Sequence, residues 1–183
     1  MKAVAVSDYR AGNVRSVLSA FRRLGVKAEV TADPETLLAA DLAVLPGVGS
    51  AATAMAALRE RGLDEALRER VRGERPTLGI CLGLQLALEE SEEDGGVPGL
   101  GLLPGRAVRL RAGRVPRIGW APVEGHGTFY FAHSYAAETE AATAFSEGVT
   151  AVAERGSFLG VQFHPEKSGA AGARFLEQCL SRA

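Results

Sequence analysis

Cys81 has the surroundings of an enzymatic nucleophile. It lies in the segment GICLGLQ, residues 79–85, with a glycine two positions before it and another two positions after it. This spacing is typical of a nucleophile elbow, a tight strand-to-helix turn that needs small neighbours. The turn would place the sulfur at a helix N-terminus, where the helix dipole favours the reactive thiolate. A free cysteine is more often a small core residue, and that is the role expected for Cys179, which lies on the apolar stripe of the last predicted helix.

A cysteine nucleophile needs a nearby imidazole, and the chain has three histidines, His126, His133 and His164. His164 is the preferred base because it is followed two residues later by Glu166, and residues two apart in extended chain share a face. The carboxylate would hold the ring in one tautomer and stabilise its protonated form. His126 lies between glycines in a predicted loop and remains an alternative base. His133 follows a predicted strand and has Tyr135 at the same spacing, which indicates a residue that lines the substrate pocket.

Attack on an acyl group creates an oxyanion that needs two hydrogen-bond donors. The first predicted donor is the backbone N–H of Leu82, the residue after the nucleophile. The second is expected from Gly47-Val48-Gly49, which follows a predicted neighbouring strand and ends at the same edge of the sheet. Glycines on both sides of Val48 let that peptide approach closely or reorient. The alternative is an ordinary turn before the next helix.

Length and composition limit the other classes of function. The 183 residues are expected to form one domain, 1–183. The net charge of −1 does not indicate binding to nucleic acid or to an anionic membrane. The first residues resemble a strand, so neither a signal peptide nor a membrane span is expected, and a cytosolic location is predicted. Two cysteines nearly a hundred residues apart cannot form a disulfide framework or a CxxC metal site. No metal or cofactor is expected.

Strand-like and helical segments alternate along the first half, which predicts parallel strands joined by crossover helices. The second half is richer in strands. The predicted fold is therefore an open, mostly parallel α/β sheet flanked by helices, with an antiparallel extension. The principal expected strands are 2–6, 27–31, 42–45, 77–80, 129–131, 151–153 and 158–163, and the expected helices include 14–24, 51–61, 82–90 and 170–180, with a loop over 91–105.

Taken together, these motifs resemble the class I glutamine amidotransferases, whose mark is GxCxGxQ followed far downstream by HPE. Within that class, the chain is similar over essentially its whole length to the glutaminase subunits of imidazole glycerol phosphate synthases. The narrower resemblance rests on LPGVGS at 45–50, GICLGLQ at 79–85, VPRIGW at 115–120, FYFAHSY at 129–135 and GVQFHPEKS at 160–168.

The resemblance implies hydrolysis of glutamine through a triad of Cys81, His164 and Glu166. It also implies that ammonia passes to a (β/α)₈-barrel cyclase, with which the chain would form a heterodimer. The residues it assigns to glutamine binding, beside the oxyanion donors, are Gln85, Glu93, His133, Ser134 and Tyr135.

Trp120 and Lys167 are the candidate contacts with the cyclase. Their alternative roles are a core tryptophan and a solvated lysine. The segment around Trp120 departs from the family pattern, because Arg117, Ile118 and Ala121 stand where the family more often has His, Met and Asn. This departure affects a predicted partner-facing segment and leaves the predicted triad intact.

Three other functions compete with this interpretation. The chain could serve another synthase, such as one that makes anthranilate or aminodeoxychorismate, with the same chemistry and a different partner. It could be a stand-alone cysteine hydrolase, which would be efficient without a partner. A catalytically silent binding module is disfavoured because it would not need Cys81, His164 and Glu166 together.

Overall fold

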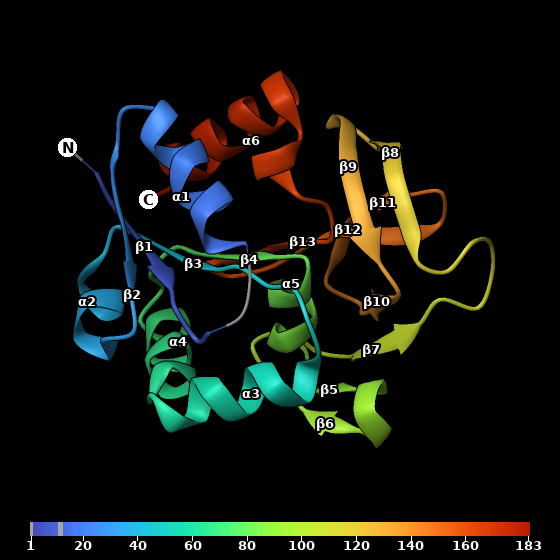
Figure 1. Ribbon diagram of the computed structural model, residues 1–183, viewed down its shortest axis with the longest axis horizontal. Coiled ribbons are helices and arrows are strands. Elements are labelled where there is room, and N and C mark those ends of the chain that lie inside the picture. The colour runs from blue at the N-terminus through green and yellow to red at the C-terminus, as the bar shows by residue number, and fades with distance from the viewer. Residues whose placement is uncertain (1, 11–12) are drawn as a thin grey trace.

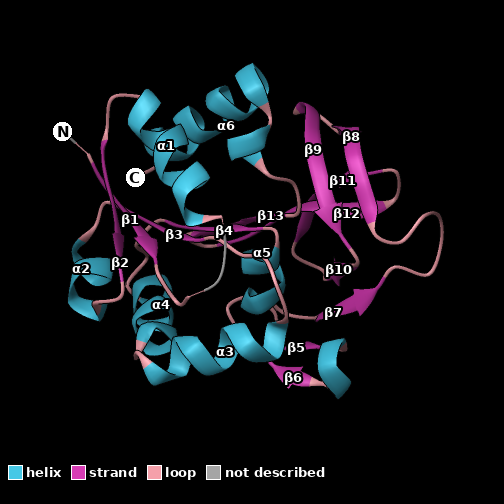
Figure 2. Cartoon of the chain, viewed as in Figure 1, coloured by secondary structure: helices cyan, strands magenta, loops and turns pink. Residues whose placement is uncertain are grey.

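Short runs of apolar residues form the central sheet, which crosses the middle of the molecule (Figures 1 and 2). The computed structural model describes residues 2–10 and 13–183. The strand order is β11-β12-β13-β4-β3-β1-β2; the five strands from β13 to β2 are parallel, and β12 and β11 extend the sheet antiparallel. This confirms the predicted fold class. The strands are β1 (Ala3–Ser7), β2 (Lys27–Thr31), β3 (Leu42–Leu45), β4 (Thr77–Ile80), β11 (Ala142–Ser146), β12 (Val149–Arg155) and β13 (Phe158–Val161).

Helices cover both faces of this sheet, so β3 and β4 are buried along their whole length. In Figure 1, α1 and α6 lie above the sheet, and α3, α4 and α5 lie below it. Each face has its own hydrophobic cluster. The helices are α1 (Val14–Arg23), α2 (Pro34–Ala39), α3 (Ala51–Glu60), α4 (Leu63–Arg72), α5 (Leu82–Ala87) and α6 (Gly169–Ser181).

Helices α2 and α4 are absent from the sequence-based prediction, although α2 has clear local signals. Asp33 caps it by accepting hydrogen bonds from two backbone N–H groups, and Pro34 occupies its first turn. Arg70 of α4 ties the two helices together. Its fully buried guanidinium donates to the carbonyls of Leu37, Leu38 and Ala40 at 2.8–2.9 Å, and to that of Pro76 at 2.8 Å. One side chain therefore satisfies carbonyls at the end of α2 and others beside the amino ends of β3 and β4.

Two smaller sheets stand beside the large one. The first has the order β10-β7-β5-β6, and the second is the β8–β9 hairpin at the right of Figure 1. The segment 91–105, predicted as a loop, contains a 3₁₀ turn, the last residue of one short strand and the whole of another. The predicted helix 82–90 ends three residues early, at Ala87. The remaining elements are β5 (Glu90–Ser91), η1 (Glu93–Gly95), β6 (Val97–Pro98), β7 (Arg106–Arg109), β8 (Arg117–Val123), β9 (Gly127–His133), β10 (Tyr135–Glu138) and η2 (Pro165–Lys167).

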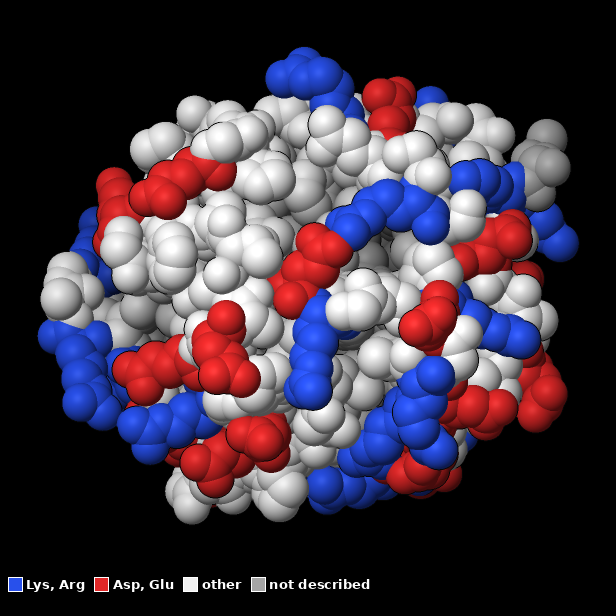
Figure 3. Space-filling view, turned by 180° about the vertical axis from the view of Figure 1, so that it is seen from behind, with Lys and Arg blue, Asp and Glu red and all other residues white. Residues whose placement is uncertain are grey.

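The sheet order brings distant parts of the chain to one edge. Strands β1, β3, β4 and β13 are neighbours and parallel, so the residues that follow them meet at their carboxyl ends, where open α/β sheets place their ligands. Within the described residues, no helix is both long and apolar enough to cross a bilayer. On the face seen in Figure 3, acidic and basic side chains are interspersed, in keeping with the small net charge.

Candidate active site

Cys81 lies at the junction of β4 and α5 with a strained backbone. Its φ of 53° and ψ of −106° are unusual for a residue with a side chain. The flanking glycines are required by close packing: a Cβ on Gly83 would lie 1.9 Å from the carbonyl oxygen of Leu45, and one on Gly79 would lie 2.9 Å from the carbonyl of Gly83. Helix α5 therefore presses against β3 and β4. The strain is at the cysteine itself, and the glycines make room for it.

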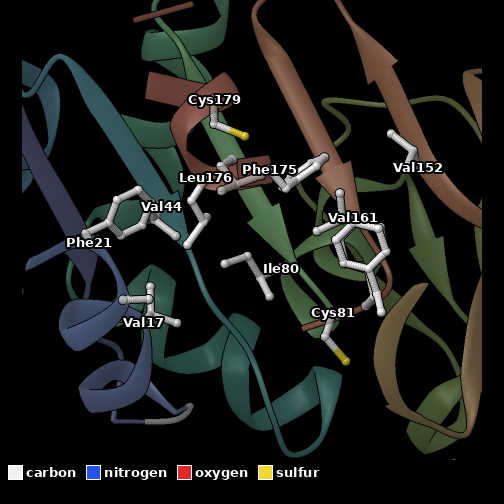
Figure 4. Close-up of a cluster of buried hydrophobic side chains, with 14 of the residues drawn as sticks. Val17, Phe21, Val44, Ile80, Cys81, Val152, Val161, Phe175, Leu176 and Cys179 are labelled. Carbon is white, nitrogen blue, oxygen red and sulfur yellow. The ribbon is translucent and has the colours of Figure 1, made fainter. Parts of the chain in front are cut away.

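The sulfur of Cys81 faces polar groups, although the residue is only 5 % exposed. Gln162 Nε2 lies 3.6 Å from Sγ, and the carbonyl oxygen of Ala132 lies 3.8 Å from it. The other thiol is different: Figure 4 shows Cys179 on α6 at the opposite end of the apolar cluster. Burial raises the pKa of Cys179 to about 12, so this thiol stays protonated and packs in the core.

His164 and Glu166 form a buried pair beside the elbow. His164 Nδ1 lies 2.8 Å from Glu166 Oε1, and both side chains are at most 2 % exposed. The backbone of His164 is also fixed, since its N–H donates to the Tyr130 carbonyl and its own carbonyl accepts from the Ser168 hydroxyl. The geometry differs from the extended chain expected from the sequence. Strand β13 ends at Val161, and Glu166 belongs to the 3₁₀ turn η2, which curls its carboxylate back toward the ring.

The environment of His164 favours a protonated ring. Burial lowers its pKa, but interactions with Cys81 and Glu166 outweigh burial and raise the pKa to about 9. An imidazolium in this position stabilises a neighbouring thiolate. The alternative base, His126, is exposed in the turn between β8 and β9, at the end of the hairpin away from His133. Seven residues of strand separate the two ends by roughly 20 Å.

His133 is a neutral residue in this environment. Its pKa is lowered to about 4, mainly by burial and also by the nearby Arg117 and His164, while a hydrogen bond to Tyr135 opposes the shift. Its Nδ1 lies 2.8 Å from the carbonyl oxygen of Tyr135, so Nδ1 carries the proton and Nε2 keeps a lone pair. Nε2 is buried and has no hydrogen-bond partner within the described part of the chain. His133 can therefore accept a hydrogen bond from a ligand.

The turn after β3 packs directly on the elbow. A Cβ on Gly47 would lie 2.5 Å from Leu82 Cβ, 2.9 Å from the Tyr9 hydroxyl and 3.0 Å from the Gly83 nitrogen. Gly49 has a φ of +102°, which favours glycine. Tyr9, which follows β1, is buried and donates a hydrogen bond to the carbonyl of Pro46 at the start of this turn. Burial and the proximity of Cys81 raise the pKa of Tyr9, so it remains a donor.

A cavity of about 240 Å³ opens beside Cys81. All the residues predicted to bind substrate line this cavity except Gly47. A larger hollow of about 330 Å³ lies at the amino ends of β4 and β13, away from the sulfur. The cavity beside Cys81 is lined by Val48, Gly49, Cys81, Leu82, Gln85, Glu93, Pro116, Ile118, Ala132, His133, Ser134 and Tyr135.

Two polar groups in this lining are already oriented by the protein. Gln85 Nε2 donates to the Tyr135 carbonyl at 2.7 Å and to Gln162 Oε1 at 3.1 Å, which leaves its own oxygen for a ligand. Glu93 Oε2 accepts a hydrogen bond from the Ala51 N–H at 2.8 Å. Burial raises the pKa of Glu93, and the Ala51 hydrogen bond opposes that shift. The second carboxylate oxygen of Glu93 can meet a cationic group.

Three residues near the reacting groups are absent from the sequence-based set. They are Tyr9, Gln162 and Asn13, whose Nδ2 lies 3.4 Å from Glu166 Oε1. Gln162 precedes the histidine motif by two residues, which is a readable signal. Tyr9 and Asn13 reach the site only because β1 lies beside β3 in the sheet. No group of three or more potential metal ligands occurs among residues 2–10 and 13–183.

Comparisons with known proteins agree with this geometry. Residues 5–183 match the family model described as glutamine amidotransferase class-I. The chain is 46 % identical over 195 residues to the imidazole glycerol phosphate synthase subunit HisH of Symbiobacterium thermophilum, covering 96 % of this chain and 92 % of the relative. It is also 46 % identical over 190 residues to the HisH subunit of Methanothermobacter thermautotrophicus, covering 94 % and 95 %.

Solved structures show the same fold at lower identity. A crystal structure of a glutamine amidotransferase has a TM-score of 0.82 at 24 % identity, covering 98 % of this chain and 97 % of that one. The structure of PurLQS from Thermotoga maritima has a TM-score of 0.75 at 18 % identity and covers 99 % of each chain.

Proposed function

This chain belongs to the class-I glutamine amidotransferase family, and from that premise we propose that the cavity beside Cys81 binds the glutamine whose amide Cys81 attacks. The function of the chain is that of the glutaminase subunit of imidazole glycerol phosphate synthase. It hydrolyses L-glutamine to L-glutamate and ammonia, and the ammonia is used by the cyclase component of the same synthase. As a biosynthetic enzyme, it is proposed to work in the cytoplasm.

One observation carries the assignment of roles. A strained cysteine, an oriented imidazole and a glycine-flanked turn meet at the carboxyl ends of three neighbouring strands, β3, β4 and β13. The 2.8 Å contact between His164 and Glu166 supports His164 as the general acid and base and Glu166 as the group that orients it. A silent binding module has no use for this arrangement.

In the first half of the reaction, the Cys81 thiolate attacks the side-chain carbonyl carbon of glutamine. The carbonyl π electrons move to oxygen, and the oxyanion is held by the Leu82 N–H and an N–H of the Gly47–Gly49 turn. Collapse of the intermediate breaks the carbon–nitrogen bond while protonated His164 gives its proton to the leaving nitrogen. Ammonia departs, and a thioester remains on Cys81.

In the second half, water replaces ammonia. Neutral His164 takes a proton from the water as its oxygen attacks the thioester carbon. Collapse then breaks the carbon–sulfur bond, which releases glutamate and restores the thiolate and the imidazolium. In the cavity, Glu93 is proposed to meet the substrate ammonium, while Gln85, His133, Ser134 and Tyr135 line the glutamine side of the pocket.

The cavity mouth carries the surface proposed for the cyclase. Ile118 lines the cavity and is 64 % exposed, and Trp120, two residues along β8, is 59 % exposed. The exposed Trp120 is not the core residue considered as its alternative role. The rings of Trp120 and Tyr130 pack edge to face, and Lys167 Nζ lies 5.9 Å from the centre of the Tyr130 ring. This apolar strip with one cation supports docking of a (β/α)₈-barrel partner as a heterodimer, with the cavity facing it.

Steady-state release of glutamate and ammonia tests this function in three states: the chain alone, with a purified cyclase, and with cyclase plus its nucleotide ligand. We expect slow turnover alone, strong activation in the liganded complex, and loss of turnover in Cys81→Ala. Trp120→Ala and Lys167→Ala should weaken activation and leave basal turnover intact. Equal turnover in all three states would instead favour a stand-alone hydrolase. Activation only by the synthase component of another pathway would show that the chain is the glutaminase of that synthase.

A further inference from the structure

The side-chain amide of Gln162 contacts the nucleophile directly. Gln162 follows β13 and is completely buried, and its Nε2 lies 3.6 Å from the sulfur of Cys81. That distance is within the range of an N–H···S hydrogen bond. Nothing in the reaction described above uses this group, although it is in contact with the reacting atom.

The orientation of the amide is determined by its neighbours. The carbonyl oxygen of Tyr135 can only accept, so the atom of Gln85 that lies 2.7 Å from it must be nitrogen. The same nitrogen lies 3.1 Å from Gln162 Oε1, which accepts its second hydrogen. The nitrogen of Gln162 must therefore face the sulfur. A chain of two amides leads from a backbone carbonyl to Cys81, and each link fixes the direction of the next.

We propose that Gln162 is a catalytic residue of the glutaminase reaction that holds Cys81 as a thiolate by donating an N–H hydrogen bond to its sulfur. The inference rests on the proposed function for its role in turnover, but the hydrogen bond itself does not. A neutral thiol is a weak acceptor and a thiolate a strong one, so this donor stabilises the charged form. It also holds the sulfur in one direction, since Gln162 is completely buried and its oxygen accepts a hydrogen bond from Gln85.

Other titratable groups also surround Cys81. The titratable groups that face it are His164 after β13, Tyr9 after β1, and His133 and Glu93 across the cavity. A substitution at Gln162 leaves all four in place, so its effect can be separated from theirs. The amide adds a fixed dipole that does not titrate between pH 4 and 10 and therefore shifts the alkylation profile of Cys81 without changing its shape.

The test is the rate at which iodoacetamide alkylates Cys81 as a function of pH, with the modified peptide identified by mass spectrometry. Gln162→Met keeps the length of the side chain and removes the donor. Losing a hydrogen bond to a charged group shifts a midpoint by about one pH unit or more. The midpoint of the alkylation profile of Gln162→Met should therefore lie higher than that of wild type by about that amount. Gln162→Glu keeps the oxygen that accepts from Gln85 and puts a second oxygen toward the sulfur, so its midpoint should rise further.

Gln178→Met is the matched control, because Gln178 is exposed on α6, and its profile should coincide with wild type. Urea unfolding of each variant tests whether it is folded. If Gln162→Met does not fold, the alkylation profile of Gln162→Glu alone tests the hydrogen bond. Unchanged midpoints in folded Gln162 variants would overturn the proposal. In the cyclase complex, Gln162→Met should lower kcat for glutamine about tenfold at neutral pH and recover part of it at higher pH. Alkylation needs no glutamine, so a shifted profile in a chain with no glutaminase activity would refute the proposed function and leave the hydrogen bond intact.

Discussion

Replacing Gly83 by alanine should displace the nucleophile without unfolding the protein. The new methyl carbon would lie 1.9 Å from the Leu45 carbonyl oxygen, whereas a carbon and an oxygen in contact are about 3.3 Å apart. Helix α5 must therefore move away from β3 by about 1.4 Å, and it carries Cys81 and Leu82 with it. A misplacement of about 1 Å at reacting groups can cost roughly 10²-fold in rate. Overpacking of this kind costs about 1–3 kcal/mol of stability, less than the total of about 5–15 kcal/mol for a typical domain.

Gly160 supplies the comparison. A Cβ there would lie 2.5 Å from Leu84 Cδ1, the movable tip of a side chain, so Gly160→Ala should cost less than Gly83→Ala in both rate and stability. The measurements are kcat for glutamine in the cyclase complex and the free energy of unfolding in urea. If Gly83→Ala kept wild-type kcat, or if Gly160→Ala were the more damaging change, the close approach of α5 to β3 would not be what positions the cysteine.

Three further outcomes are expected. Burial lowers the pKa of His164, but Cys81 and Glu166 raise it to about 9. Protonation of this ring therefore stabilises the fold fully below about pH 6.5, and the contribution disappears as the pH rises through 9. Urea unfolding between pH 6 and 10 should show this loss of stability, and the loss should be smaller in Glu166→Gln. Arg70→Met should lower the free energy of unfolding by about 3–5 kcal/mol, because it leaves several buried carbonyls without a donor. Arg72→Met, at a mostly exposed position on the same helix, should change the free energy of unfolding in urea by less than about 0.5 kcal/mol. Tyr9→Phe keeps the ring and removes the donor to the turn after β3, so kcat for glutamine should fall about tenfold with KM little changed, and an unchanged kcat would show that the turn holds its position without this bond.

The parts of the fold that were predictable are those with local signals. Strand β3 is a continuous apolar run and β4 is apolar after Thr77, and the glycines around Cys81 and Val48 mark tight turns by their spacing alone. The sequence pattern does not indicate helix α4, because six of its ten residues are charged and its structural role depends on one arginine that reaches the carbonyls of another helix. That contact joins α4 to residues about thirty positions earlier, and no periodicity within the helix indicates it.

The candidate site shows the same division. The two-residue spacing of His164 and Glu166 predicts their pairing, but it is a 3₁₀ turn and not extended chain that brings the carboxylate to the ring. The contact between Gln162 and Cys81 depends on β13 pairing with β4, which the order of the sequence does not reveal. Tyr9 likewise needs β1 beside β3. Residues that belong to a recognisable motif, such as His164 and the Gly47–Gly49 turn, can be assigned from the sequence, whereas Tyr9, which belongs to none, cannot.

The position of β13 in the sheet has a consequence for biosynthesis of the chain. This strand pairs with β4, yet it is made about eighty residues later, after the strands of both small sheets have been synthesised. At about 5–20 residues per second, β4 waits several seconds or more with one edge unpaired. During that interval the cysteine has neither its imidazole nor its amide neighbour, so a nascent or truncated chain cannot release ammonia. An incomplete chain would also aggregate through the exposed edge of β4. The last quarter of the sequence therefore both covers this edge and completes the active site.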